Sequence, residues 1–228
     1  MKKVAVLLSG CGLYDGSEIH EAVFSLLAIS QNGLSYQCFA PNKAQLHVVN
    51  HVNGEVVEES RNVLEESARI ARGDIQDLKS LNLKDFDALV IPGGFGAAKN
   101  LNQWAMHGPS GEIDADVKNQ IQAFVAANKP ILALCMGPTV VAKALENTEY
   151  HPKLTVGTVS EESPYDIKGI SDGMESIGSV VEMKSIKEFA IDEDLNILSA
   201  PCYMMEGSIA DVHDNIQMAV KALKSRLA

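Results

Sequence analysis

Short runs of apolar residues, many of them β-branched, alternate along this chain with segments of helical periodicity. The runs are apolar at successive positions, which is typical of parallel strands buried on both faces. We therefore expect an α/β fold with a mostly parallel sheet and helices on both faces. The expected strands are residues 4–8, 36–40, 88–91, 131–134, 154–157, 180–183 and 197–199, and the expected helices are residues 17–31, 61–71, 114–127, 138–145 and 209–227.

The length and the evenness of the composition favour one domain over residues 1–228. Hydrophobic residues make up 46% of the chain but aromatic residues only 5%, so the core would be built from aliphatic side chains. The sequence contains no linker-like stretch, internal repeat or low-complexity segment. One short hairpin is expected to turn at Asn53-Gly54.

Four loops follow expected strands directly, and each carries residues with chemical potential. They read SGCGLYDGSE, PGGFGAAKN, CMGPT and APCYM. Ligands of open parallel sheets bind outside the carboxyl ends of the strands. We therefore expect these four loops to meet at one functional site.

Cys135 lies at the tip of the strand 131–134, in the pattern Ala-Leu-Cys-Met-Gly. A small residue, a nucleophile and a glycine at this spacing are typical of a sharp, strained turn from a strand into a helix. The helix N-terminus would favour the thiolate, and the amide of Met136 could bind an oxyanion. The pattern predicts a nucleophile, although a buried free cysteine at a strand end is the alternative.

The loop PGGFGAAKN allows three interpretations. Its glycines could cradle a phosphate, but the G-K-[ST] sequence of a P-loop is absent. It could equally be a tight turn. Beside an elbow at Cys135, the amides of Gly93 and Gly94 are better interpreted as part of an oxyanion hole.

The stretch DGSEIHEAV is expected to begin a helix, and it contains the three acidic residues Asp15, Glu18 and Glu21. Asp15 and Glu18 have the spacing of a capping box, with Asp15 as the N-cap. Glu21 has no such structural explanation and lies beside an apolar stripe, where burial would raise the pKa of its carboxyl and let it move protons. A solvated surface glutamate is the alternative.

The remaining cysteines and histidines point to no metal site. Cys38 is expected in the core, whereas Cys11 and Cys202 follow strands and could line the site, respond to oxidants or simply pack. The six histidines show no metal-ligand spacing. We therefore expect neither a metal nor another cofactor.

The net charge of −11 argues against nucleic acid and anionic membranes as partners. No apolar segment approaches membrane-spanning length, and the N-terminal MKKVAVLLSG is better interpreted as a first strand than as a signal peptide. Four cysteines without a disulfide-rich framework favour a reducing, cytoplasmic location.

These residues together resemble the PfpI-like superfamily, also called class I glutamine amidotransferase-like. Within it, VLLSGCGLYDGSEIHEAV and PGGFGAAKNL are most similar to the ElbB family, and RNVLEESARIARGDI and APCYM extend the similarity over nearly the whole chain. The resemblance implies a flavodoxin-like sandwich, a homodimer, and a glyoxalase-type lyase or hydratase activity that converts glyoxal to glycolate. It also implies a link to isoprenoid biosynthesis.

The resemblance carries over to individual residues. Cys135 matches the elbow cysteine, Glu21 matches the helix glutamate that contacts it, and Gly93 and Gly94 match the oxyanion loop. Two family features are missing, because LTVGTVSEE and SAPCYMMEG contain neither the histidine that follows the elbow in many members nor the H-P-E of amidotransferases. Glutamine hydrolysis is therefore not expected.

Two functions from different classes remain open. In the first, Cys135 attacks glyoxal or a related small α-oxoaldehyde and Glu21 moves protons, with no cofactor. In the second, the same thiol is oxidised to a sulfinic acid held by Glu21, and the protein senses or regulates. The segment NQWAMHGPSGEI could be a lid over the site or an interface element.

Overall fold

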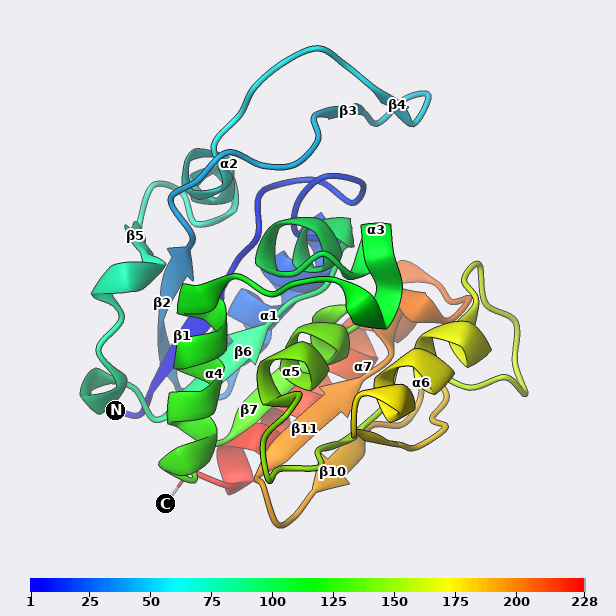
Figure 1. Ribbon diagram of the computed structural model, residues 1–228. Coiled ribbons are helices and arrows are strands. Elements are labelled where there is room, and N and C mark those ends of the chain that lie inside the picture. The colour runs from blue at the N-terminus through cyan, green and yellow to red at the C-terminus, as the bar shows by residue number, and fades with distance from the viewer. Residues whose placement is uncertain (228) are drawn as a thin grey trace.

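The structure is a computed structural model that describes residues 1–227. A seven-stranded sheet runs in the order β10-β11-β7-β6-β1-β2-β5 (Figure 1). Its strands are β1 (Lys3–Leu7), β2 (Ser35–Ala40), β5 (Ile75–Asp77), β6 (Ala88–Ile91), β7 (Ile131–Leu134), β10 (Ala190–Asp192) and β11 (Ile197–Ala200). All neighbours pair in parallel except β10, which lies antiparallel to β11 at one edge.

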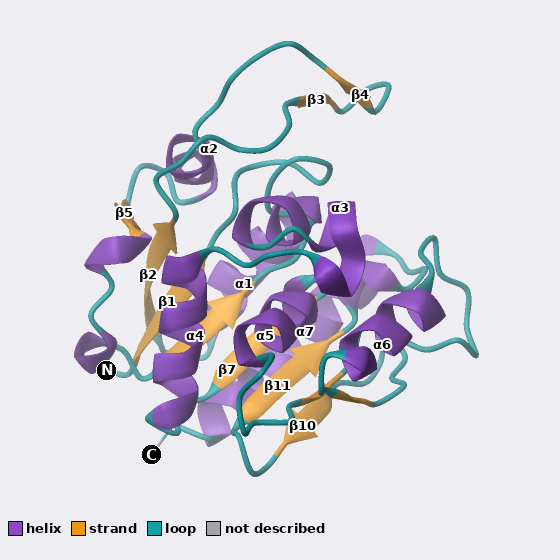
Figure 2. Ribbon diagram, in the orientation of Figure 1, coloured by secondary structure: helices purple, strands orange, loops and turns teal. Residues whose placement is uncertain are grey.

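Helices cover both faces of this sheet, which gives the expected three-layer sandwich (Figure 2). On one face α1 packs against α7, and on the other α4 packs against α5. The helices are α1 (Ile19–Gln31), α2 (Val63–Ile70), α3 (Trp104–His107), α4 (Ala115–Ala126), α5 (Gly137–Leu145), α6 (Ile167–Ser176) and α7 (Ile209–Ser225).

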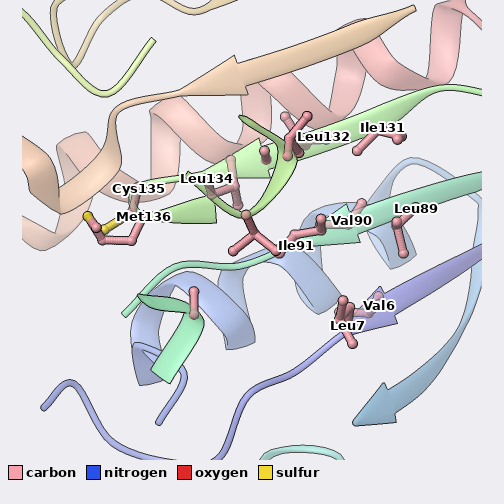
Figure 3. Close-up of a cluster of buried hydrophobic side chains, with 14 of the residues drawn as sticks. Val6, Leu7, Leu89, Val90, Ile91, Ile131, Leu132, Leu134, Cys135 and Met136 are labelled. Carbon is pink, nitrogen blue, oxygen red and sulfur yellow. The ribbon is translucent and has the colours of Figure 1, made fainter. Parts of the chain in front are cut away.

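The central strands are buried on both faces, as their continuous apolar sequences require. Every residue of β6 and β7 is fully buried, and their side chains belong to the same hydrophobic cluster as those of β1 (Figure 3). The bounds of both strands match the expected 88–91 and 131–134. Cys135 and Met136 continue directly from this cluster, so the loop that follows β7 is anchored in the buried core.

Two expected strands lie outside the main sheet. Residues 154–157 and 180–183 contribute only the short pair β8 (Lys153–Leu154) and β9 (Val180–Val181), which forms a separate parallel ribbon. The hairpin expected at Asn53-Gly54 is confirmed, because β3 (Val49–Asn50) pairs antiparallel with β4 (Glu55–Val56). That all 228 residues form one domain stays a prediction.

The first helix begins two residues later than expected. Glu18, rather than Asp15, is the N-cap of α1, and its Oε2 accepts a hydrogen bond of 2.7 Å from the amide of Glu21. Asp15 is buried and accepts from the amide of Val49 at 2.7 Å, which ties its loop to the hairpin segment. The capping box expected between Asp15 and Glu18 is therefore wrong, because the carboxyl of Asp15 has a partner elsewhere.

Candidate functional site

Cys135 occupies the turn between β7 and α5, as the elbow pattern predicts. Its φ of 56° lies in the left-handed region, which is strained for a side chain without a local hydrogen-bonding group. The backbone amide of Cys135 donates to the carbonyl of Ala200 at 2.9 Å and so extends the pairing of β7 with β11. The thiol is only 3% exposed, but it lines a pocket.

Gly137 allows the sharp turn at this elbow. A β-carbon at residue 137 would lie 2.7 Å from the carbonyl oxygen of Ile91 on the neighbouring strand, which is too close for any side chain. Helix α5 can therefore begin directly above β6 only if residue 137 is glycine. This contact explains the last position of the elbow pattern in physical terms.

Glu21 is fully buried at the start of α1 and is fixed by two loops. Its Oε2 accepts from the amide of Gly93 at 3.1 Å, and its Oε1 accepts from the amide of Tyr203 at 3.2 Å. Gly93 follows β6 and Tyr203 follows β11, so two of the four expected loops meet at Glu21, and all four contribute residues to the pocket at Cys135. The alternative of a solvated surface glutamate is wrong.

Gly93 lies between the carboxyl and the thiol. A β-carbon at residue 93 would lie 2.7 Å from Oε2 of Glu21 and 2.8 Å from the sulfur of Cys135. The three residues therefore form one compact unit, in which the absent side chain of Gly93 lets the carboxyl and thiol approach each other.

The carboxyl of Glu21 is protonated at neutral pH. Burial, and secondly the charge of Glu18, raise the pKa of Glu21 to about 8, although the amides of Tyr203 and Gly93 pull it down. A buried carboxyl with this pKa can exchange its proton near physiological pH, as a proton-transfer group must.

The thiol of Cys135 behaves differently from the sequence-based expectation. Burial, and secondly the charge on Glu21, raise the pKa of Cys135 well above its usual value. The amides of Gly94 and Met136 act in the opposite direction but do not overcome burial. The expectation of a thiolate in the resting protein is therefore wrong. The helix N-terminus lowers the pKa of Cys135 less than burial and the adjacent carboxyl raise it.

The glycine loop also differs in detail from the expected oxyanion hole. Gly93 uses its amide to bind Glu21, so this amide is not available to a substrate oxyanion. The amides that act on the sulfur are those of Gly94 and Met136. Of the two glycines, Gly94 and not Gly93 directs its amide at the sulfur, and its role in an oxyanion hole stays a prediction.

Glu18 and Cys11 do not line the pocket at Cys135. Glu18 caps α1, and burial raises the pKa of its carboxyl. Cys11 is half-buried in a separate groove between α1 and α2, where Arg69 also lies, and burial raises the pKa of its thiol. Glu18 can thus influence the site through its charge on Glu21, whereas Cys11 belongs to another surface.

The pocket at Cys135 has a volume of about 220 Å³ and a largely apolar wall. The segment NQWAMHGPSGEI supplies part of this wall through Trp104 and Ala105. Trp104 is buried, and an added β-carbon at Gly173 of α6 would lie 3.0 Å from its ring. The pocket is lined by Leu13, Gly94, Phe95, Trp104, Ala105, Cys135, Met136, Tyr165, Ile170 and Met204.

Tyr165 is a site residue that the sequence did not indicate. It lies just before α6, its half-buried ring contacts Phe95 edge-on at 5.9 Å between ring centres, and it faces the pocket. Burial, and then the charges of Cys135 and Glu21, raise the pKa of Tyr165 to about 12, so its hydroxyl carries a proton. No motif surrounds Pro164-Tyr165, and only the folded chain brings it to Cys135.

Histidine is absent from the wall of this pocket as described within residues 1–227. His20 lies nearby on α1, but its Nδ1 pairs with the hydroxyl of Tyr203 at 2.8 Å. In the same part of the chain, no group of three or more His, Cys, Asp or Glu residues is arranged to hold a metal ion. None of the described helices is long and apolar enough to cross a membrane.

Two animal proteins are similar to this chain in sequence over most of its length. It is 41% identical over 223 residues to the human protein named glutamine amidotransferase-like class 1 domain-containing protein 3, mitochondrial. The aligned region covers 96% of this chain and 81% of the human protein. It is 32% identical over 212 residues to the zebrafish ES1 protein, mitochondrial, which covers 89% of this chain and 77% of that one.

Solved structures agree with the fold. A crystal structure from Ehrlichia chaffeensis, described as an isoprenoid biosynthesis protein with an amidotransferase-like domain, has a TM-score of 0.90 and 36% identity over the full length of both chains. Drosophila DJ-1beta, at 15% identity, has a TM-score of 0.52 over 99% of this chain and 90% of that one, and shows the fold alone. Residues 15–148 match the DJ-1/PfpI family, and the chain belongs to that family.

Proposed function

We propose that the protein is a cofactor-independent, glyoxalase-like enzyme that converts an α-oxoaldehyde to the corresponding hydroxyacid. The observation that carries the proposal is the unit formed by Cys135, Gly93 and Glu21, in which Cys135 lines a partly open pocket. It combines a nucleophile with a proton carrier whose pKa is about 8.

The first step joins the sulfur to the aldehyde carbon. Ionised Glu21 takes the thiol proton of Cys135 as the S–C bond forms, and the carbonyl π electrons move to oxygen. The amides of Gly94 and Met136 stabilise this oxyanion. The reactive form of the pair therefore holds one proton, and its population rises as the pH approaches the pKa of Glu21.

The second step is an internal oxidation and reduction that needs no external electron acceptor. Glu21 first gives the thiol proton to the oxyanion, which forms a hemithioacetal and leaves Glu21 ionised again. Glu21 then removes the proton from the former aldehyde carbon while the neighbouring carbonyl oxygen takes a proton from solvent, which gives an enediol. Glu21 returns a proton to the second carbon and the hydroxyl of the first carbon loses its proton to solvent, so the first carbon is oxidised to a thioester and the second is reduced to an alcohol. Water then cleaves the thioester, which releases the hydroxyacid and restores the thiol of Cys135. For glyoxal, the sum is glyoxal plus water giving glycolate.

Product analysis in D₂O tests this mechanism. Wild-type protein should form glycolate from glyoxal with deuterium at its second carbon, because the proton of Glu21 exchanges with solvent. Cys135→Ala and Glu21→Gln should each reduce turnover by at least 100-fold. Equal turnover by wild type and Cys135→Ala would sink the proposal, and glycolate without deuterium would remove Glu21 from the second step.

A redox-sensing role is the second candidate, and one observation favours it. Because Glu21 is protonated at neutral pH, it can donate a hydrogen bond to an oxidised Cys135. Two equivalents of peroxide would convert the thiol to a sulfinic acid and release two molecules of water. Mass spectrometry after mild peroxide should then locate two added oxygens on Cys135, and oxidation of another cysteine alone would contradict this role.

Three further proposals accompany the function. Within the DJ-1/PfpI family we place the chain in the ElbB group, with a link to isoprenoid biosynthesis. This placement is based on the motifs quoted above and on the similar structure from Ehrlichia.

We propose that the protein is a homodimer, because α1 carries the exposed apolar row Ile19, Val23 and Leu27. Analytical ultracentrifugation would test the oligomeric state. Four free cysteines are consistent with a reducing, cytoplasmic compartment.

A further inference from the structure

The pocket at Cys135 is much larger than glyoxal requires. Glyoxal has four non-hydrogen atoms, whereas the pocket encloses about 220 Å³. An apolar cavity of about 150 Å³ in another protein takes up a benzene molecule. A two-carbon dialdehyde bound to the sulfur would therefore leave space for a group the size of an aromatic ring.

The wall of the pocket is suited to an apolar group. Its main surfaces are the rings of Phe95 and Trp104 and the side chains of Ile170 and Met204. In the described part of the chain, its ten lining residues include no Lys, Arg, Asp or Glu. A phosphate or carboxylate on the substrate would lose its hydration here without gaining a counter-ion, which excludes charged aldehydes.

One polar group in the wall is available to a ligand. Within residues 1–227, the hydroxyl of Tyr165 has no hydrogen-bond partner, and contact with Phe95 fixes its ring. The phenol lies close enough to Cys135 and Glu21 for their charges to act on it. An uncharged donor at this place matches a carbonyl oxygen next to the carbon that the sulfur attacks.

We propose that this site selects neutral α-oxoaldehydes with an apolar substituent the size of an aromatic ring, for which phenylglyoxal is the probe. The substituent lies against Trp104 and Phe95, and Tyr165 donates a hydrogen bond to the keto oxygen. The proposal rests on the proposed function, because Cys135 must attack the aldehyde carbon. Atoms balance as for glyoxal: phenylglyoxal plus water gives mandelate.

Turnover provides the first test. The kcat/KM of the full chain should be roughly 10- to 100-fold higher for phenylglyoxal than for glyoxal, since the aromatic ring becomes buried. Each value is divided by the rate at which the same aldehyde adds to a small free thiol, which removes differences in hydration and intrinsic reactivity. Equal normalised values, or a preference for glyoxal, would overturn the proposal and leave the glyoxalase function standing.

A pair of variants on one helix tests where the ring binds. Ala105→Phe narrows the pocket and should lower the ratio of kcat/KM for phenylglyoxal to kcat/KM for glyoxal at least 10-fold. Met106→Phe adds a ring to the next residue, which is exposed and does not line this pocket, and should change neither value. Equal loss for both substrates in Ala105→Phe would place the aromatic ring elsewhere.

A second pair of variants tests Tyr165. Tyr165→Phe keeps the ring contact with Phe95 and removes the hydroxyl, so kcat/KM for phenylglyoxal should fall roughly 10-fold. Inhibition by benzaldehyde, which has no keto oxygen, should stay the same, whereas a merely structural effect would weaken both. Tyr14→Phe is the matched control, because Tyr14 is also near Phe95 but outside the pocket, and it should change neither.

Binding without chemistry separates the two possible failures. Trp104 is the sole tryptophan of the chain and lines the pocket, so its fluorescence reports occupancy. In Cys135→Ala, 2-hydroxyacetophenone should bind at least 10-fold more tightly than hydroxyacetone, and Ala105→Phe should abolish that difference. Selective binding without turnover in wild type would refute the enzyme but retain the pocket's selectivity, and equal binding would refute the selectivity itself.

Discussion

The carboxyl of Glu21 and the sulfur of Cys135 approach each other on either side of Gly93, within 2.8 Å of the position that a β-carbon there would occupy. Neither group is ionised in the resting protein at neutral pH, because burial raises the pKa of both. Cys135 therefore becomes reactive only when the pair of groups has lost one proton. Four predictions follow from this arrangement and its surroundings.

Reactivity of Cys135 should follow the ionisation of Glu21. Alkylation by iodoacetamide should rise about 10-fold per pH unit below pH 8 and level off above it, because ionised Glu21 accepts the thiol proton. Glu21→Gln should remove this step near pH 8. A rate that is constant between pH 6 and 9, followed by mass spectrometry at residue 135, would contradict the coupling.

The charge of Glu18 should influence the pH at which the alkylation rate of Cys135 rises. The charge of Glu18 contributes to the raised pKa of Glu21, and a glutamine at position 18 keeps an oxygen that can cap α1. In Glu18→Gln the alkylation step should therefore move to lower pH, with little change in stability. Glu58→Gln, in an exposed loop, is the control and should leave the profile unmoved.

Glu21 should make stability decrease as the medium becomes alkaline. Its folded pKa is about 8, above the ordinary 4.5, so its stabilising effect is complete below about pH 4.5 and is lost as the pH rises through 8. Wild type should lose on the order of 5 kcal/mol relative to Glu21→Gln between these limits. Urea unfolding at pH 5, 7 and 9 measures this difference, and parallel curves for the two proteins would refute it.

The four cysteines should differ in accessibility. Cys11 is half-exposed in an open groove and should react with a bulky maleimide, whereas Cys135 should admit only small reagents through its pocket. Cys38 and Cys202 are fully buried and should react only after unfolding. Peptide mapping after timed labelling gives the order, and early labelling of Cys202 would be inconsistent with this fold.

Much of the fold could be predicted because its central strands are buried on both faces. The bounds of β6 and β7 match residue for residue, since proline or glycine flanks continuous apolar runs. The edge strand β10 and helix α6 were not predicted, because β10 has only three residues and α6 contains Gly169 and Gly173, which disfavour a helix. Residues 154–157 are buried, but only Leu154 joins the short ribbon, which shows that burial alone does not define a sheet strand.

The proximity of Cys135 and Glu21 agrees with the sequence-based expectation, but their electrostatics does not. The elbow pattern singled out Cys135, whereas the local sequence left Glu21 open between a buried and a surface position, and the structure brings the two together at Gly93. The sign of the pKa shift of Cys135 depends on burial and on a carboxyl 114 positions away in the chain, which no local motif reports. Tyr165 and Trp104 lie in segments without regular periodicity, so their position at the pocket follows only from the folded chain.

The reacting groups and the pocket wall originate in different segments of the polypeptide. Glu21, Gly93 and Cys135 are anchored by α1 and the ends of core strands, while Trp104 and Tyr165 belong to connections that pack on one another through α6. Exchanging these connections would therefore alter which molecules enter without rebuilding the chemistry beneath them. In the proposed enzyme, substrate preference would therefore be separable from catalytic capacity.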